Sequence, residues 1–407
     1  MRGATFDAFA IAAPGLEALV AAELNALGIP ARAEEGGASF RADLETLYRA
    51  NLHLRVASRV IVRVAQFRAQ AFHELERRAR QVPWERFVTP GRVVRLRVTC
   101  RKSRLYHERA VEERLLEAID RRAGPIVTAA GGGGAPNGST GERHGAAGFE
   151  ADDGADAQLF VVRFLRDVCT ISADASGALL HVRGYRQALA KAPMRETLAA
   201  ALLMVSGWDP ARGQPLVDPF CGSGTIPIEA ALFARRIAPG LANPGLEPRV
   251  YAFQSWPEHD PELWTRVVES ARSRVLPAAG MEIRGSDRDA GAVTASRGNA
   301  ERAGVVGDVV FEARAISAVE PPVSPPGEPG ALVTNPPYGV RIGERDRLRN
   351  LFAAFGRVAR ERFPGWLMTV LSADRFLEAH LGLPLEEALR TRNGGIPVRV
   401  LVGRVPD

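Results

Sequence analysis

The sequence predicts an α/β protein whose C-terminal half forms a parallel sheet, preceded by smaller alternating units of strand and helix. Three segments carry this prediction. Residues 216–235 read as a strand, a glycine-containing turn and a helix, and two later strands end in polar residues, at Asp287 and at Asn335. Because ligands in open α/β folds bind at the carboxyl ends of the strands, we expect these three strand ends to line one crevice.

Length and composition exclude several classes of protein. At about 150 residues per domain, the 407 residues predict two to three domains. A hydrophobic share of 46% and a charged share of 25% exclude a collagen and a mostly disordered chain. No apolar run approaches the ~20 residues of a membrane helix, and the N-terminus lacks a signal-peptide pattern. The widely spaced Cys100, Cys169 and Cys221 predict no disulfide framework, so we expect a protein of the reducing cytoplasm without membrane or metal partners.

The positive charge is concentrated near the N-terminus. Residues 1–126 hold 22 lysines and arginines against 15 acids, whereas the rest of the chain holds 31 against 32. The net charge of +6 therefore arises in the first third of the chain. An excess of this kind attracts polyanions and says nothing about the fold.

The first third alternates short strands and helices, too short for a nucleotide-binding sheet. Leucines at helical spacing predict helices, and alternating valines predict strands. A glycine-rich run at 130–157 predicts a flexible insertion rather than a phosphate loop, because no helix follows it. The predicted strands cover 9–13, 38–41, 56–66, 92–99, 159–165, 169–172 and 179–182, and the predicted helices cover 15–27, 44–52 and 108–123.

One stretch of the N-terminal part is basic without interruption. Between Arg86 and His107 there are seven cationic residues and no acid. Such a strand and turn predict a face that binds phosphates without reading base sequence, and a solvated strand face is the alternative. The candidate RNA-binding residues are Arg92, Arg95, Arg97, Arg101, Lys102 and Arg104.

The C-terminal half contains a glycine turn at 216–225, with the sequence Leu-Val-Asp-Pro-Phe-Cys-Gly-Ser-Gly-Thr. Its glycines permit a tight turn and the close approach of a ligand. It matches neither the Walker lysine loop nor the complete dinucleotide fingerprint, so a plain strand-to-helix turn is the alternative. Asp287 follows the next strand, where a carboxylate can bind ribose hydroxyls. We predict strands at 281–286, 331–334, 366–372 and 398–405, helices at 196–206, 226–235 and 290–303, and an insertion at 237–273.

The segment Asn335-Pro336-Pro337-Tyr338 is the most specific signal. Tandem prolines fix the backbone and remove two N–H donors, so their carbonyls and the Asn335 amide oxygen can accept hydrogen bonds from an exocyclic amine. Tyr338 offers a face on which a base can stack, worth ~1–3 kcal/mol. The alternative is a Pro-Pro turn that merely ends a strand.

These three segments resemble the motifs of class I S-adenosylmethionine-dependent amino-methyltransferases. The resemblance implies a Rossmann-like domain at 186–407 with a mostly parallel seven-stranded sheet, preceded by a ferredoxin-like domain at 1–60 and a THUMP RNA-binding domain at 61–185. The group most similar to this chain is the bacterial guanine-N2 methyltransferases of 23S rRNA. Further segments that resemble THUMP-domain RNA methyltransferases are 13–17, 174–177, 183–186, 196–201, 238–241 and 253–256.

The resemblance also implies residue roles toward S-adenosylmethionine and a guanine. The acid that usually contacts the adenine amine would fall at Ala315, which leaves Asp308 and Glu312 as alternatives for that contact. The target guanine would be held by Asn335, Pro336, Pro337 and Tyr338. The cofactor would lie against Glu196, Thr197, Asp218, Cys221, Gly222, Gly224, Thr225 and Asp287.

The implied reaction is direct transfer of a methyl group from the sulfonium to the exocyclic N2 amine of a guanine in 23S rRNA, which depends mainly on positioning. A THUMP-type tRNA guanine-N2 methyltransferase and an adenine-N6 methyltransferase are alternatives, because Asn-Pro-Pro-Tyr serves both chemistries. A non-catalytic RNA-binding or assembly factor is an alternative of another class, favoured by Ala315 alone.

Overall fold

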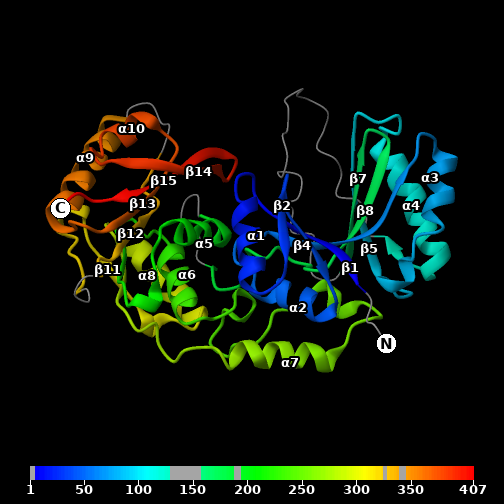
Figure 1. Cartoon of the computed structure of the whole chain (residues 1–407), viewed down its shortest axis with the longest axis horizontal. Helices are drawn as coiled ribbons and strands as arrows, with labels where there is room; N and C mark the ends of the chain where they lie inside the picture. Colours follow the sequence, from blue (N-terminus) through cyan, green and yellow to red (C-terminus); the bar gives the residue numbers. More distant parts are fainter. Residues whose placement is uncertain (1–4, 129–156, 188–193, 324–327, 339–344) are drawn as a thin grey trace.

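The computed structural model describes residues 5–128, 157–187, 194–323, 328–338 and 345–407 (Figure 1). Within these residues the chain forms an eight-stranded sheet from its N-terminal half and a seven-stranded sheet from its C-terminal half. The predicted insertion at 130–157 lies outside the described residues, except for Ala157, which begins a strand.

The N-terminal sheet has the strand order β2-β3-β1-β4-β8-β7-β5-β6. Because β4 pairs with β1 on one side and with β8 on the other, the segments predicted as ferredoxin-like and THUMP domains share this sheet. The boundary predicted at 60/61 therefore falls inside β4. The strands are β1 Phe6–Ile11, β2 Ala31–Glu34, β3 Gly37–Ala42, β4 Arg59–Arg68, β5 Val93–Arg101, β6 Val127–Thr128, β7 Ala157–Leu165 and β8 Val168–Asp174.

Among the described residues, four α-helices accompany this sheet. Asp43 caps one of them through its carboxylate, which accepts a hydrogen bond from the Thr46 amide (2.8 Å). The helix at 108–123 has the limits predicted from its apolar spacing. The helices are α1 Glu17–Ala26, α2 Leu44–His53, α3 Phe72–Ala79 and α4 Glu108–Ala123.

The C-terminal sheet has the order β11-β10-β9-β12-β13-β15-β14. Its strands are parallel up to β13, and β15 runs antiparallel to both β13 and β14. This confirms the predicted α/β class with a mostly parallel, seven-stranded sheet. The strands are β9 Leu216–Asp218, β10 Ile283–Asp287, β11 Val309–Ala313, β12 Ala331–Thr334, β13 Leu367–Ser372, β14 Leu385–Asn393 and β15 Ile396–Arg404.

One helix of this half, α7, lies within the predicted insertion. It packs against α2 of the N-terminal half and buries Trp264, Val267 and Val268. It therefore joins the two halves along one side of the molecule (Figure 1). The helices are α5 Glu196–Val205, α6 Thr225–Ala234, α7 Pro261–Arg272, α8 Ala290–Arg302, α9 Arg345–Arg362 and α10 Arg375–Ala379.

The strand predicted at 179–182 is wrong, because these residues form a turn. The Val182 amide donates to the Leu179 carbonyl (3.0 Å), and the Leu180 amide donates to the Ser58 carbonyl (2.9 Å). Leu179 and Leu180 are buried. Their apolar pattern therefore reflects packing of the segment that joins the two sheets rather than a strand.

The two halves also meet at Gly15, in the turn between β1 and α1. Its φ is +86°, and a Cβ atom built there would lie 1.9 Å from the carbonyl oxygen of Arg390 on β14. The backbone of the N-terminal turn thus packs directly on the backbone of the last hairpin. Only glycine meets both demands, since it has no side chain and adopts positive φ without strain.

Replacing Gly15 by alanine tests this contact, with Gly36→Ala as the matched control. Gly36 has a similar φ of +84° but has open space where a Cβ would lie. The control is expected to lose about 1–2 kcal/mol of unfolding free energy from backbone strain alone. Gly15→Ala is expected to lose about 1–3 kcal/mol more through overpacking, measured by urea denaturation. Equal losses in the two variants would contradict the close contact.

Candidate functional site

The carboxyl end of β9 leads into the predicted glycine turn. Gly222 and Gly224 adopt φ values of +52° and +81°, and Gly224 caps α6. A Cβ at Gly224 would lie 2.9 Å from the side chain of Ser296, whereas a Cβ at Gly222 would meet nothing within 4 Å. The turn is thus packed on one side against α8 and open on the other.

Asp218, the last residue of β9, is buried and ties this strand to its neighbour. Its carboxylate accepts hydrogen bonds from the Thr334 hydroxyl (2.5 Å) and from the Phe220 amide (3.1 Å). Burial, and to a lesser extent the charge of Asp287, raises the pKa of Asp218 to about 7. Since Thr334 ends β12, this bond fixes the glycine turn relative to the Asn-Pro-Pro-Tyr segment.

Asp287 ends β10 and holds the glycine turn from the other side. One carboxylate oxygen accepts from the Gly222 amide (3.1 Å), and the other accepts from the Asp289 amide (3.0 Å). The preceding Ser286 hydroxyl is buried and has no hydrogen-bond partner among the described residues. Each carboxylate oxygen keeps a second lone pair, so Asp287 retains acceptor capacity for a ligand.

Cys221 packs in this turn as a buried thiol. Its amide donates to the Ser286 carbonyl (2.9 Å). Burial raises the pKa of the thiol well above its usual value, which keeps the sulfur protonated and unreactive. Thr225 is also buried, at the start of α6. These two residues therefore support the turn rather than supply a nucleophile.

The Asn-Pro-Pro-Tyr segment follows β12 directly. The Asn335 amide oxygen is buried and accepts no hydrogen bond from the described residues. A buried acceptor left in this state costs about 1–3 kcal/mol, which a donor from a bound ligand would recover. Pro336 is buried and Pro337 is exposed.

Tyr338 is half-buried and is fixed by a residue far away in the sequence. Its hydroxyl accepts a hydrogen bond from the Asn393 side-chain amide (2.6 Å). Burial raises the pKa of Tyr338, so the phenol stays protonated at neutral pH. Sequence reasoning missed both Asn393 and Thr334. The Asn-Gly pair at 393–394 is a hairpin-turn signal, but nothing local shows that the turn reaches Tyr338.

Glu196 and Thr197 begin α5 and are both buried. The Glu196 carboxylate lies 3.4 Å from a guanidinium nitrogen of Arg186. Burial raises the pKa of Glu196 to about 7, although the Arg186 charge opposes the shift. One Glu196 oxygen has no hydrogen-bond partner among the described residues.

The structure places the three candidate positions for the adenine contact differently relative to β11. Ala315 is exposed just beyond β11. Asp308 precedes β11, at the amino end of that strand, where it pairs with Arg235 (3.2 Å) and accepts from the Ala279 amide (2.8 Å). It therefore lies at the wrong edge of the sheet for a cofactor. Glu312 lies on β11 and pairs with Arg314 (3.2 Å).

The six basic candidates lie apart from this crevice. Arg92 directly precedes β5, and the other five lie on β5 or in the turn that follows it, at the end of the molecule opposite the C-terminal sheet (Figure 1). The side chains of Arg95, Arg101, Lys102 and Arg104 are exposed, whereas Arg92 and Arg97 are half-buried. In the part of the chain that the structure describes, no cluster of side chains is suited to a metal ion. No described helix is long and apolar enough to cross a membrane.

Two family models match the chain. An RMKL-like methyltransferase domain matches residues 183–400, and an RlmL ferredoxin-like domain matches residues 7–61. The chain is 37% identical over 405 residues to the ribosomal RNA large subunit methyltransferase K/L of Syntrophotalea carbinolica, covering 97% of this chain and 53% of that protein. The chain therefore spans about half the length of that enzyme.

Two further proteins match along almost their whole length. The slr0064 protein of Synechocystis, provisionally named an RNA methyltransferase, is 32% identical, with 97% of this chain and 95% of that protein covered. SMU.472, provisionally classed as a methyltransferase and solved with SAH, superposes with a TM-score of 0.81 at 28% identity, covering 99% and 98% of the two chains. With these matches and a Rossmann-like sheet that ends in the methyltransferase motifs, the chain belongs to the family of RMKL-like methyltransferases.

Proposed function

We propose that this protein is an S-adenosylmethionine-dependent RNA methyltransferase that modifies the exocyclic N2 amine of a guanine in 23S rRNA. The observation that carries the proposal is the buried amide oxygen of Asn335, which has no hydrogen-bond partner among the described residues and lies at the strand edge beside the glycine turn. The matched K/L enzyme methylates large-subunit rRNA by its name, and SMU.472 was solved with SAH. Such an enzyme would work in the cytoplasm, where its three free thiols stay reduced.

The residues at the carboxyl ends of β9 and β10 fit the proposed cofactor. The turn backbone at Gly222 is open to a ligand, and the Ser286 hydroxyl beside it is buried without a partner among the described residues. Asp287 would accept hydrogen bonds from ribose hydroxyls, and Glu196 and Thr197 would cover the methionine end. The cofactor supplies an electrophilic methyl group on a sulfonium. The residues that we propose to contact the cofactor are those that the family resemblance implies, from Glu196 to Asp287.

The chain itself would position the base. The Asn335 amide oxygen and the Pro336 carbonyl would accept the N–H bonds of the exocyclic amine, which aims its lone pair toward the methyl group. As positive charge develops on that nitrogen, the same oxygens stabilise it. The Tyr338 ring would stack on the base, held in place by Asn393. A base within folded RNA must be splayed out to reach this position.

The N-terminal half would bind the RNA. Residues 1–60 would form a ferredoxin-like part and residues 61–185 a THUMP part, within one shared sheet. The basic β5 and its turn would contact the phosphates of an RNA that extends away from the crevice. This arrangement gives the positive charge of the first third a role in substrate binding.

Incubation with labelled S-adenosylmethionine tests the proposal. Undermodified 23S rRNA, tRNA and a DNA duplex are offered separately, and the labelled nucleoside is identified. We expect N2-methylguanosine in 23S rRNA. Label confined to tRNA or to N6-methyladenosine would assign the chain to one of the alternative enzymes, and absence of both label and cofactor binding would favour a binding protein.

Asn335→Ala is expected to lower the rate of methyl transfer by roughly 10²-fold or more, because it removes an acceptor needed in the transition state. Cofactor affinity, measured by calorimetry, is expected to stay the same. Asn350→Ala, at an exposed position on α9, is the matched control and should keep full activity. A loss of cofactor binding in Asn335→Ala would contradict the proposal that this residue holds the base.

Asp218→Asn tests the buried carboxyl through the pH dependence of stability. Because the folded pKa of about 7 lies above the usual aspartate value, the folded protein keeps a proton that the unfolded chain releases as the pH rises from about 4 to 7. The wild type is therefore expected to lose unfolding free energy across this window relative to the variant. Asp346→Asn, exposed on α9, controls for charge removal. Parallel pH profiles for the wild type and Asp218→Asn would contradict the shift.

The double variant Arg101→Ala/Lys102→Ala tests the basic turn. RNA affinity is expected to fall at low salt, and the slope of log K against log salt to decrease by roughly 0.7 for each phosphate that the variant no longer neutralises. Arg77→Ala/Arg78→Ala removes the same charge from exposed positions on α3. If both double variants bind RNA alike, β5 and its turn have no special role.

A further inference from the structure

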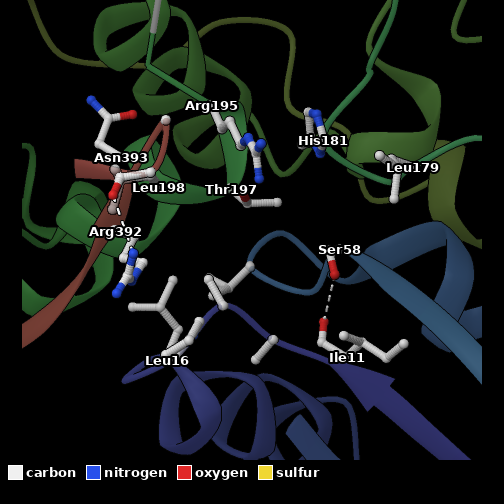
Figure 2. A pocket seen from close by; sticks show the side chains of 16 residues that line it. Ile11, Leu16, Ser58, Leu179, His181, Arg195, Thr197, Leu198, Arg392 and Asn393 are labelled. Carbon is white, nitrogen blue, oxygen red and sulfur yellow. Dashed lines mark hydrogen bonds between the residues drawn. The ribbon is translucent and has the colours of Figure 1, made fainter. Parts of the chain in front are cut away.

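A small cavity lies between the N-terminal sheet and the methyltransferase sheet (Figure 2). One side is formed by the end of β1 and the turn after it, with Ile11 and Leu16, and by Ser58 just before β4 (Figure 2). The opposite side is formed by His181 of the connecting segment and by Arg195 and Thr197 at the start of α5. The tip of the β14–β15 hairpin, residues 392–395, closes a third side.

Half of the described residues that line this cavity are aliphatic, and the ionisable ones are all basic. Arg195, Arg392 and His181 contribute basic groups, and none of the described residues that line it is an acid. The Arg392 guanidinium donates one hydrogen bond to the Gly395 carbonyl (3.2 Å) within its own hairpin. A guanidinium has five N–H donors in a planar fork, so Arg392 retains the capacity for a two-point contact with an anion.

The cavity is linked to the base-binding segment through one of its lining residues. Asn393, which lines it, donates the hydrogen bond that fixes the Tyr338 hydroxyl. Thr197, which also lines it, begins the helix that would cover the methionine end of the cofactor. The cavity therefore shares Asn393 with the support of the proposed base stack, and it shares Thr197 with the helix proposed to cover the cofactor.

The volume limits what the cavity can hold. At about 80 Å³ it is far smaller than the ~300–1,000 Å³ of pockets that enclose drug-sized ligands. It suits a single polar group. The combination of two guanidinium groups and no carboxylate selects a phosphate, for which arginine provides planar, paired hydrogen bonds.

We propose that this cavity binds the backbone phosphate next to the methylated base of the RNA. The proposal rests on the function proposed above and adds a second contact point on the same substrate. Splaying a base out of its stack swings the adjoining backbone, and phosphate contacts fix the register of a nucleic acid on its protein. The Ala13-Pro14-Gly15 turn, docked on β14 through Gly15, then acts as the wall that shapes this subsite.

Arg392→Ala is the main test, with Arg357→Ala as the charge-matched control on the exposed face of α9. The RNA substrate is an undermodified 23S rRNA transcript. We expect the KM for RNA to rise about tenfold in Arg392→Ala and the salt slope of RNA binding to decrease by about 1. The Kd for S-adenosylmethionine should not change. Arg392→Lys keeps the charge but loses the fork, so an intermediate KM is expected.

The possible outcomes separate the proposals. Equal RNA binding by Arg392→Ala and Arg357→Ala would overturn the subsite. Calorimetric titration with inorganic phosphate distinguishes a free anion from an RNA phosphate. The RNA assignment would be overturned if the wild type bound inorganic phosphate at submillimolar concentration, and if Arg392→Ala abolished this binding but left the RNA affinity unchanged. The cavity would then be assigned to a free anion. If the wild type binds RNA but transfers no methyl group, the proposed function fails, and the comparison of the two variants still decides the subsite.

Discussion

The placement of the two sheets depends on one buried carboxylate, Glu229 on α6. It forms a buried ion pair with Arg183 and accepts a hydrogen bond from the Tyr185 hydroxyl (2.8 Å). Arg183 in turn donates to the Arg55 carbonyl (2.7 Å), and Arg55 donates to the Ile237 carbonyl (2.6 Å). Removing one member of such a pair would leave a buried charge uncompensated, which typically costs about 3–5 kcal/mol. The network therefore specifies a single orientation of the N-terminal half on the methyltransferase domain.

This network matters for function because α6 has two tasks. Its first turn follows Gly224 and forms one wall of the proposed cofactor site, and one turn further along it carries Glu229. The helix that shapes the crevice is thus the helix that anchors the N-terminal half. An RNA bound to β5 would be positioned relative to the reacting base through a single rigid element, supplemented by the packing of Gly15 on β14 and of α7 on α2.

The sequence predicted elements whose signals are local. Short segments with apolar residues placed β10, β12 and β13 within two residues of their observed limits, and placed the start of β9 at Leu216. The edge strand β14 was missed, because Leu385–Asn393 is mostly exposed, rich in charged residues and interrupted by a bulge between Glu387 and Leu389. An edge strand of this kind lacks the alternation of a half-buried strand, and its charges are typical of protection against pairing with another chain.

The candidate site likewise combines positions that the sequence predicts with contacts that it does not predict. Asp218 and Asp287 end strands and Asn335 directly follows one, so their positions at one sheet edge could be predicted from the chain alone. The bonds that organise them join residues far apart in sequence, as Thr334 does with Asp218 and Asn393 with Tyr338. Such contacts depend on the strand order, in which β12 lies next to β9, and on the packing of β14 against the N-terminal turn at Gly15. The tip of the β14–β15 hairpin also closes one side of the cavity between the two sheets. The distant halves of the chain therefore meet where the base and its adjoining phosphate would have to be held together.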